Sequence, residues 1–331
     1  MLRPRNLTAL AGTAAIALLM TACGTTGQSS PSGQLDKGDL KGATIAFVPG
    51  VNDPFYISMQ CGIQAAAAEQ GIRVKTQIPQ QFEAAVQTPV VNSVVAAHPD
   101  ALLVAPTDGQ ALIPPLRRAT SAGIPVGLVD TTLQDPSLAF TSIATDNVDA
   151  GGQAAETLAK LIGERGSVLV IAFQSGATTS DQRQKGFEKR IADYPGIHYI
   201  GAQVNNNDPA KAASIVSAAL AAHPNLAGVF ATNVSAAQGA ATGARNAGAQ
   251  GKLKIVGFDA GATQVEQLKR GDVQALIAQQ PEQIGRLAVK QTIAQLTGED
   301  VDKKIGTDTV VVTRDNLDKP EVKRALYRES C

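Results

Sequence analysis

The sequence predicts an α/β protein built from two doubly wound lobes, each a parallel sheet between layers of helices. From residue 41 onward, short β-branched runs alternate with longer Ala-rich stretches, and this rhythm restarts near residue 145. The strand candidates are apolar throughout, as expected for a sheet covered on both faces. About 290 residues remain after the N-terminal leader, which is enough for two domains of about 100–200 residues each.

In the first half of the chain, turn and cap signals mark the ends of the elements. Proline favours the first helical position, so a helix is expected to begin at Pro54, and glycine closes it at Gly71. Gly123 ends a later helix in the same way. The predicted strands are 44–48, 74–77, 101–104 and 125–129, and the predicted helices are 54–70, 82–97 and 111–121.

The second half repeats the alternation. Pro195 and Gly196 stop one of its helices. The predicted strands are 167–171, 198–202, 228–231, 255–258, 275–278 and 309–313, and the predicted helices are 150–163, 183–194, 210–222, 236–247, 262–270 and 281–296.

Composition excludes several classes of function. Lys and Arg together number 29, and so do Asp and Glu, so the chain has no basic field for nucleic acid. With three His and three Cys, a zinc cluster is not expected, and neither a cofactor nor another metal is predicted. The sequence has no Gly-x-Ser-x-Gly elbow and no phosphate-cradling glycine loop, so it is not expected to be an enzyme. One enzymatic alternative stays open, because Asp130 and Asp259 would pair in a glycosidase.

The first residues indicate export. Arg3 and Arg5 precede an apolar run too short to span a bilayer, which favours a signal peptide over residues 1–22. Small residues before Cys23, with Met20 three positions upstream, resemble a bacterial lipobox. Lipidation at Cys23 and a flexible tether over 23–42 would hold the protein outside the cytoplasm on the cell membrane. The alternative is an ordinary signal peptide with a chance cysteine.

Cys61 and Cys331 are the other two cysteines. In an oxidising compartment they can form one disulfide that pins the C-terminal tail to the first helix. The alternative is a buried Cys61 and a free Cys331.

Polar, planar side chains follow nearly every predicted strand. In open parallel sheets ligands bind beyond the carboxyl ends of the strands, so these residues are expected to converge. Carboxylates accept hydrogen bonds, guanidinium donates them and carboxamides do both, which suits adjacent sugar hydroxyls, while aromatic faces suit the C–H surface of a sugar. The candidate ligand-binding residues are Asp53, Phe55, Tyr56, Asp130, Thr131, Arg183, Asn207, Asn233, Asp259 and Gln279.

Each candidate also has a simpler structural interpretation. Asp53 is placed to cap the helix at Pro54, and Phe55 is suited to plain core packing. Asn207 belongs to a polar turn, and Arg183 has the option of pairing with a surface carboxylate. The joint pattern favours a ligand site, because independent turns need not all select such groups.

Seven stretches resemble the ribose-binding-like branch of the sugar-binding proteins of ABC importers, and the resemblance covers about residues 41–313. It implies the type I periplasmic binding protein fold, two lobes joined by a three-crossing hinge. The stretches lie at 52–56, 105–108, 123–126, 143–147, 222–224, 256–259 and 277–285.

The resemblance also implies roles for individual residues. Phe55 and Tyr56 match two aromatics that sandwich the sugar, and Asp130 matches an aspartate that binds ring hydroxyls. The second lobe would contribute Arg183, and the matches there extend to Asn233, Asp259 and the hinge-side Gln279.

Three positions depart from the ribose binder. Asp53 replaces asparagine, Thr131 replaces arginine and Asn207 replaces an aromatic residue. These changes argue against ribose itself and favour another pentose, a hexose or a linear polyol.

The resemblance places the first lobe at 43–145 with 280–308, and the second at 146–279 with the final strand and tail, 309–331. The expected function is capture of a small neutral sugar or sugar alcohol by hinge closure, followed by delivery to an ABC permease, by a monomer. Presentation of the sugar to a membrane receptor is the alternative.

Overall fold

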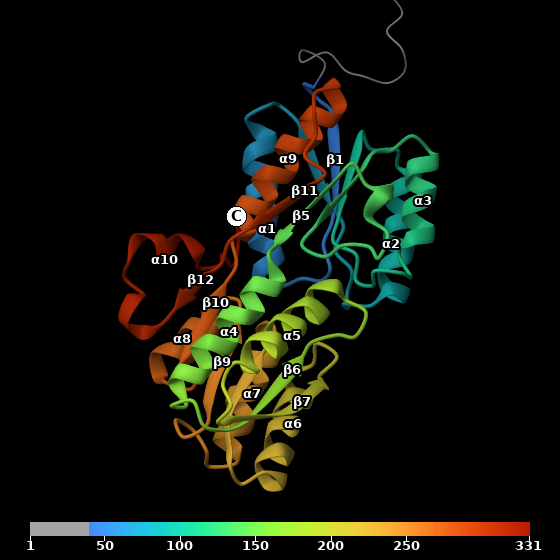
Figure 1. Ribbon diagram of the computed structural model, residues 1–331. Coiled ribbons are helices and arrows are strands. Elements are labelled where there is room, and N and C mark those ends of the chain that lie inside the picture. Colours follow the sequence, from blue (N-terminus) through green and yellow to red (C-terminus); the bar gives the residue numbers. More distant parts are fainter. Residues whose placement is uncertain (1–39) are drawn as a thin grey trace, which may run out of the picture. The chain divides into compact units, whose positions relative to one another are not determined.

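A computed structural model of the protein describes residues 40–331, and Figure 1 shows its arrangement. Two six-stranded sheets organise these residues. The first sheet has the order β11-β5-β4-β3-β1-β2, and all of its pairs are parallel. Its strands are β1 (Thr44–Val48), β2 (Arg73–Thr76), β3 (Ala101–Val104), β4 (Val126–Val129), β5 (Thr141–Thr145) and β11 (Lys304–Thr307).

The second sheet has the order β12-β10-β9-β8-β6-β7. It is parallel except for its edge strand β12, which pairs antiparallel to β10. Its strands are β6 (Gly166–Ala172), β7 (Ile197–Val204), β8 (Leu226–Ala231), β9 (Lys254–Phe258), β10 (Ala275–Ala278) and β12 (Val310–Val312).

Helices cover both faces of each sheet, which is why the central strands are apolar throughout. On the first sheet, Leu103 packs toward the face of α1 and α9, while Leu102 packs toward α2 and α3. These helices are α1 (Pro54–Ala68), α2 (Ala84–Ala96), α3 (Ile113–Ser121) and α9 (Pro281–Thr297). We call this sheet and its helices the first lobe.

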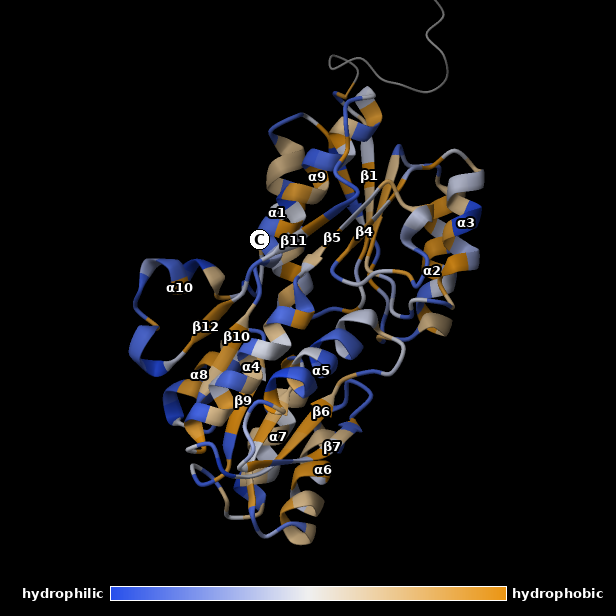
Figure 2. Cartoon of the chain, viewed as in Figure 1, coloured by the Kyte–Doolittle hydropathy of each residue, from blue (hydrophilic) through white to orange (hydrophobic). Residues whose placement is uncertain are grey.

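The second lobe follows the same plan. Val170 packs toward α4 and α5, while its neighbour Ile171 packs toward the opposite face. Figure 2 shows the hydrophobic colour concentrated in the strands and on the inward faces of the helices. The helices of this lobe are α4 (Asn147–Leu161), α5 (Thr178–Ile191), α6 (Pro209–Ala222), α7 (Val234–Asn246), α8 (Ala262–Arg270) and α10 (Pro320–Ala325).

The chain passes between the two sheets three times, after β5, after β10 and after β11. The predicted two-lobed α/β fold is therefore confirmed. The expected lobe boundaries at 145/146, 279/280 and 308/309 fall in these three connecting segments.

The structure corrects several element predictions. The strand expected at 309–313 is β12, whereas the edge strand β11 of the first sheet was not predicted. Strand β5 was not predicted, because its sequence Thr-Ser-Ile-Ala-Thr carries little apolar signal. Helix α5 begins at Thr178, earlier than the expected 183, and α4 begins at Asn147, earlier than the expected 150. Helix α10 was not predicted.

Glycines allow α4 and α5 to pack closely in the second lobe. A Cβ on Gly151 would overlap the backbone carbonyl of Arg183, whereas a Cβ on Gly152 would have Arg190 Cβ at 3.8 Å as its nearest neighbour. We therefore expect Gly151→Ala to lower the free energy of unfolding by about 1–3 kcal/mol, because the helices must separate.

Gly152→Ala is the matched control, one residue away in the same helix. It is expected to be neutral or to stabilise the protein by up to about 1 kcal/mol, since alanine favours helix. Urea denaturation of both variants measures the difference, and equal unfolding free energies would contradict a tight contact at Gly151.

Candidate binding site

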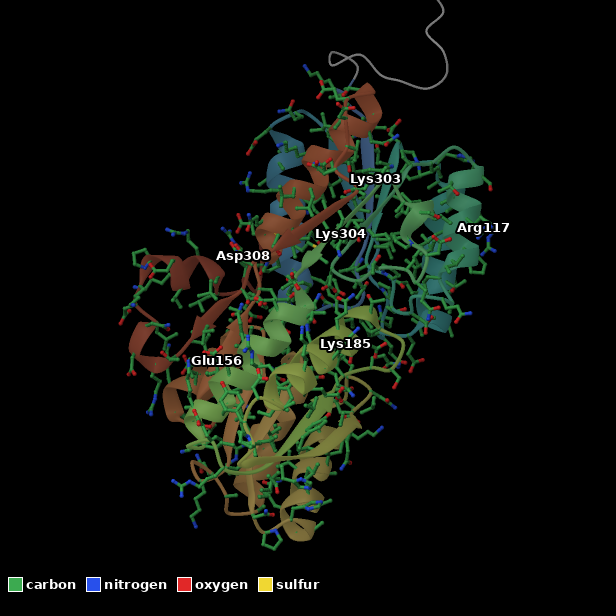
Figure 3. All side chains as sticks on the ribbon, in the orientation of Figure 1. Arg117, Glu156, Lys185, Lys303, Lys304 and Asp308 are labelled. Atoms are coloured by element: carbon green, nitrogen blue, oxygen red, sulfur yellow. A yellow bond between two sulfur atoms is a disulfide. The ribbon has the colours of Figure 1, made fainter. Side chains whose placement is uncertain are left out.

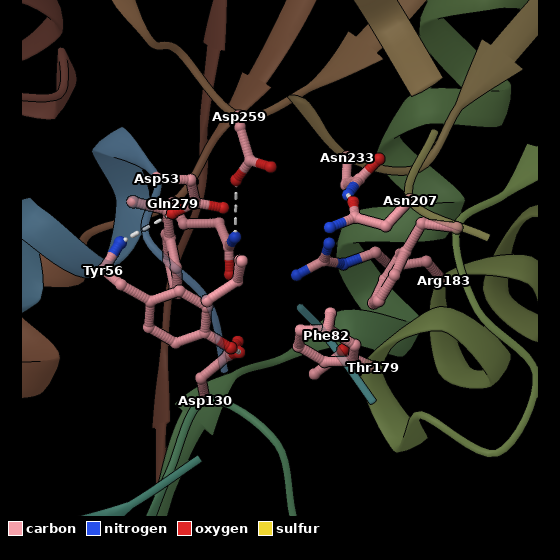
Figure 4. Close-up of a pocket in the computed structure, with 13 residues that line it drawn as sticks. Asp53, Tyr56, Phe82, Asp130, Thr179, Arg183, Asn207, Asn233, Asp259 and Gln279 are labelled. Carbon is pink, nitrogen blue, oxygen red and sulfur yellow. Dashed lines mark hydrogen bonds between the residues drawn. The ribbon is translucent and has the colours of Figure 1, made fainter. Parts of the chain in front are cut away.

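A cavity with about 360 Å³ of empty volume lies between the carboxyl ends of the two sheets. Figure 4 shows side chains from both lobes pointing into it. The lining residues are Val51, Asp53, Phe55, Tyr56, Phe82, Asp130, Phe173, Thr179, Arg183, Asn207, Asn233, Asp259 and Gln279.

Asp130 and Asp259 occupy equivalent positions in the two lobes. Each follows a sheet strand, β4 or β9, and each has a left-handed backbone, with φ of 63° and 77° respectively. Their N–H groups donate to Ile143 O and Ile277 O, both at 2.8 Å, so each turn is fixed to the neighbouring strand. Left-handed backbone is costly for residues other than glycine and tends to persist at functional sites, where surrounding contacts enforce it.

Two lining residues also cap helices. Asp53 Oδ1 accepts from Tyr56 N–H at 2.9 Å and caps α1, and Asn233 Oδ1 accepts from Ala236 N–H at 3.0 Å and caps α7. Capping therefore describes only part of the role of Asp53, because the same side chain reaches the cavity wall. Asn207 joins this group through its Oδ1, which accepts from Asn233 Nδ2 at 2.6 Å.

Arg183 comes from α5 and is only 2% exposed. Its Nε donates to Asn147 Oδ1 and an Nη donates to Thr232 O, both at 2.8 Å. Its guanidinium lies 3.7 Å from the centre of the Phe258 ring, a cation–π contact. Pairing of Arg183 with a surface carboxylate is therefore wrong, since these contacts aim the cation into the cavity (Figure 4).

Hydrogen bonds also hold the side chains of Asp130, Asp259 and Gln279 in place. Tyr56 Oη donates to Asp130 Oδ2 at 2.7 Å. Gln279 Nε2 donates to Asp259 Oδ1 at 2.7 Å, while its Oε1 accepts from Thr145 Oγ1 at 2.7 Å. The last bond joins β5 of the first lobe to the end of β10 in the second.

Burial changes the ionisation of the three carboxylic acids. Loss of contact with water raises the pKa of Asp53 to about 7 and that of Asp130 to about 6. Burial also raises the pKa of Asp259, while the Arg183 cation lowers the pKa of both Asp130 and Asp259. The cavity thus combines three acids with one cation, and its acids are pushed toward the neutral form.

A pH dependence of stability follows from Asp53. Its pKa is raised from 3.8 to about 7, so between these pH values the unfolded chain is ionised while the folded chain still holds the proton. The contribution of this group is fully present below pH 3.8 and is lost as pH rises toward 7. The loss approaches about 1.4 kcal/mol per pH unit.

Asp53→Asn isolates this effect, because asparagine caps helices as well as aspartate does. The stability difference between wild type and variant is expected to change from pH 4 to pH 7, in favour of the variant at the higher pH. Denaturant midpoints across this range measure it, and parallel curves would contradict the raised pKa.

The structure does not bring Thr131 to the cavity wall. Thr131 is buried, at 1% exposure, and is not among the residues that line the cavity. The other nine sequence-predicted ligand residues do line the cavity.

Sequence reasoning missed four lining residues: Val51, Phe82, Phe173 and Thr179. Phe173 directly follows β6, so the strand-end rule itself would have found it. Phe173 therefore supplies an aromatic side chain of the second lobe at the cavity, although Asn207 stands where the ribose binder has an aromatic residue.

The lobes touch each other at the edge of the cavity. The rings of Phe82 and Phe173 meet edge to face at 5.6 Å. Gly109 N–H donates to Gly176 O at 3.2 Å, and Thr132 N–H donates to Thr178 Oγ1 at 2.9 Å. These contacts join loops of the first lobe to the segment that runs from the end of β6 to the first residue of α5 in the second lobe.

Other kinds of site are not found in the described part of the chain. Within residues 40–331, no group of three His, Cys, Asp or Glu side chains is arranged to hold a metal ion. Over the same residues, none of the helices has the length and hydropathy to cross a membrane. Figure 3 labels Arg117, Glu156 and Lys185, which belong to α3, α4 and α5, and ion pairs such as Lys160–Glu156 join opposite charges within a single helix.

Comparison with known proteins identifies the family to which this chain belongs. A model described as periplasmic binding protein domain matches residues 45–300. The ribose import binding protein of Bacillus subtilis is 30% identical over 84% of this chain and 90% of its own length. This chain belongs to the periplasmic binding protein family.

Solved structures of the family show the same fold. An ABC transporter solute-binding protein from Agrobacterium vitis, bound with α-D-tagatopyranose, is 41% identical with a TM-score of 0.85, covering 87% of this chain and 100% of that one. A second from the same organism, with bound D-fucose, is 32% identical with a TM-score of 0.82 over 86% and 100%. These relatives are binding proteins, so the prediction of a binding protein instead of an enzyme is confirmed.

Proposed function

We propose that the protein is the sugar-binding receptor of an ABC importer and that its ligand is a monosaccharide or sugar alcohol. The observation that carries the proposal is the cavity between the lobes, whose lining combines Asp53, Asp130 and Asp259 with Arg183. The similarity to tagatose-bound and fucose-bound proteins of the same family supports a hexose or a deoxyhexose over a larger glycan.

The chemistry of the lining fits hydroxyl recognition. The acids accept hydrogen bonds from hydroxyls when ionised and can donate one when protonated, and Arg183 donates only. Phe55, Phe82 and Phe173 supply apolar faces for the C–H side of a sugar. A ligand held by groups from both lobes favours the state in which the lobes are together.

Calorimetric titration with D-tagatose, D-fucose, D-ribose and sugar alcohols tests the proposal. At least one is expected to bind with one ligand per chain and to raise the melting temperature with the logarithm of its concentration. Maltose, a disaccharide, serves as a comparison ligand larger than a monosaccharide. Absence of binding across pentoses, hexoses and polyols would overturn the proposal, and turnover of a chromogenic glycoside would favour a glycosidase instead.

We further propose that the protein is extracytoplasmic, lipid-anchored through Cys23, and delivers its ligand to a permease. Residues 1–22, Cys23 and nearly all of the tether lie outside the described residues. The lipobox-like sequence supports the anchor. Mass spectrometry of the mature N-terminus tests it: a diacylglyceryl thioether on Cys23 is expected, and an unmodified thiol would refute it. Uptake of labelled sugar by cells with and without the protein tests delivery.

A further inference from the structure

The C-terminal tail connects the second lobe to the first outside the three strand crossings. After β12, a strand of the second sheet, the tail forms α10 beside that strand and then runs to α1 (Figure 1). There Arg328 N–H donates to Ser58 Oγ at 2.7 Å, and Cys331 is bonded to Cys61 in a disulfide that spans 270 residues of sequence. The tail is therefore covalently tied to the first lobe.

Tyr327 lies in the middle of this connection, behind the cavity. Its Oη donates to Asp259 Oδ1 at 2.9 Å and accepts from Gln279 N–H at 3.1 Å. Its own N–H donates to Ala260 O at 3.1 Å, and its ring lies 5.8 Å from that of Phe55. Tyr327 is 7% exposed and is not among the residues that line the cavity.

We propose that Tyr327 is a positioning residue of the binding site, and that the Cys61–Cys331 disulfide holds it in place. A single hydroxyl contacts both Asp259 and Gln279, so it fixes the relative placement of two lining groups that come from different strands. Asp259 also has a left-handed backbone, which places extra demand on the contacts that hold its side chain.

The disulfide is expected to hold the end of the tail because the non-covalent interactions of Arg328 with the first lobe are weak. Arg328 pairs with Glu282 at 3.3 Å, but this ion pair is half exposed. Exposed ion pairs and single hydrogen bonds each contribute only about 0–1.5 kcal/mol. Without the covalent link, the last residues are expected to detach often and to leave Tyr327 less well held. Cys331 is an exposed residue, whereas its partner Cys61 is buried.

Tyr327→Phe tests the positioning role while keeping the ring and the disulfide. We expect exchange of the Gln279 amide proton to become about tenfold faster, because that N–H loses its acceptor. Tyr199→Phe is the matched control, since Tyr199 Oη donates to Glu188 at 2.9 Å away from the cavity. Unchanged Gln279 exchange in Tyr327→Phe would overturn the positioning role.

A pH profile of sugar binding by Tyr327→Phe distinguishes a positioning role of the Tyr327 hydroxyl from simple packing of the ring. Burial raises the pKa of Asp259, while Arg183 and the hydrogen bonds from Gln279 and Tyr327 lower it. The carboxyl groups of Asp53 and Asp130 also face this site. Loss of the Tyr327 hydroxyl therefore raises the pKa of Asp259 further. The acidic limb of the binding curve is expected to move to higher pH, with affinity about tenfold weaker near neutrality. A curve that superimposes on that of wild type would overturn the proposal.

Cys331→Ser tests the disulfide in the full-length chain, since it changes one exposed terminal residue. Faster Gln279 exchange is expected in this variant and in wild type treated with reductant, while the variant itself is insensitive to reductant. If the Gln279 amide proton of Cys331→Ser exchanged as slowly as that of oxidised wild type, the proposed role of the disulfide would be overturned. The affinity readout rests on the proposed sugar binding, but amide exchange does not. A wild type that binds no sugar therefore refutes the proposed function and leaves the exchange test intact.

Discussion

Asp259→Ala is expected to weaken sugar binding by at least about 100-fold, which corresponds to about 2.7 kcal/mol. The change removes the acceptor of two buried donors, Gln279 Nε2 and Tyr327 Oη, together with an acceptor for the ligand. Each unpaired buried group costs about 1–3 kcal/mol. Asp130→Ala is expected to act in the same direction, because Tyr56 Oη loses its acceptor at 2.7 Å.

Calorimetric titration with the best-binding sugar measures these losses. Asp193→Ala serves as the control, because its side chain is 62% exposed and pairs with Arg190 on the outside of the second lobe. Its dissociation constant is expected to match that of wild type. If Asp259→Ala and Asp130→Ala bound sugar as tightly as this control, the cavity would not be the binding site.

Arg183→Met is expected to reduce both affinity and stability. Methionine keeps much of the length and apolar surface but leaves Asn147 Oδ1 and Thr232 O without their donor. It also removes the cation that lowers the pKa of Asp130 and Asp259. Loss of one member of a buried charged set costs about 3–5 kcal/mol, so we expect a fall of this size in the free energy of unfolding and a loss of detectable sugar binding.

Arg190→Met is the matched control on the same helix, with a side chain that is 51% exposed and an ion pair to Asp193 at 3.3 Å. Its stability is expected to stay within about 0.5 kcal/mol of wild type. Urea denaturation and titration compare the two variants. An equally small loss of unfolding free energy in Arg183→Met and Arg190→Met would contradict the proposed role of Arg183.

Strand ends were the part of the site that sequence could locate. The runs before Asp130 and Asp259 are apolar and short, so the strands were recognisable, and the first polar residue after each marks the edge of a parallel sheet. Gln279 was found in the same way after β10, whose predicted and observed bounds agree.

Other elements lacked such a signal. Strand β5 alternates buried and half-buried residues and is rich in Ser and Thr, and β11 is a four-residue edge strand with a glycine. Both are strands because they pair with neighbours, and pairing is a property of the assembled sheet. Residue Phe82 illustrates the same limit within the site, since it precedes α2 and follows no apolar run.

The sequence by itself determined the alternation of strands and helices, and therefore the two sheets and the edge at which polar groups gather, because both arise from local hydrophobic pattern and chain connectivity. Tertiary structure decided which aromatic side chains close the cavity, that Arg183 turns inward, and that Tyr327 lies behind Asp259 although 68 residues separate them in the chain. Those contacts depend on how separate segments pack in space, and no local pattern of residues records such distances.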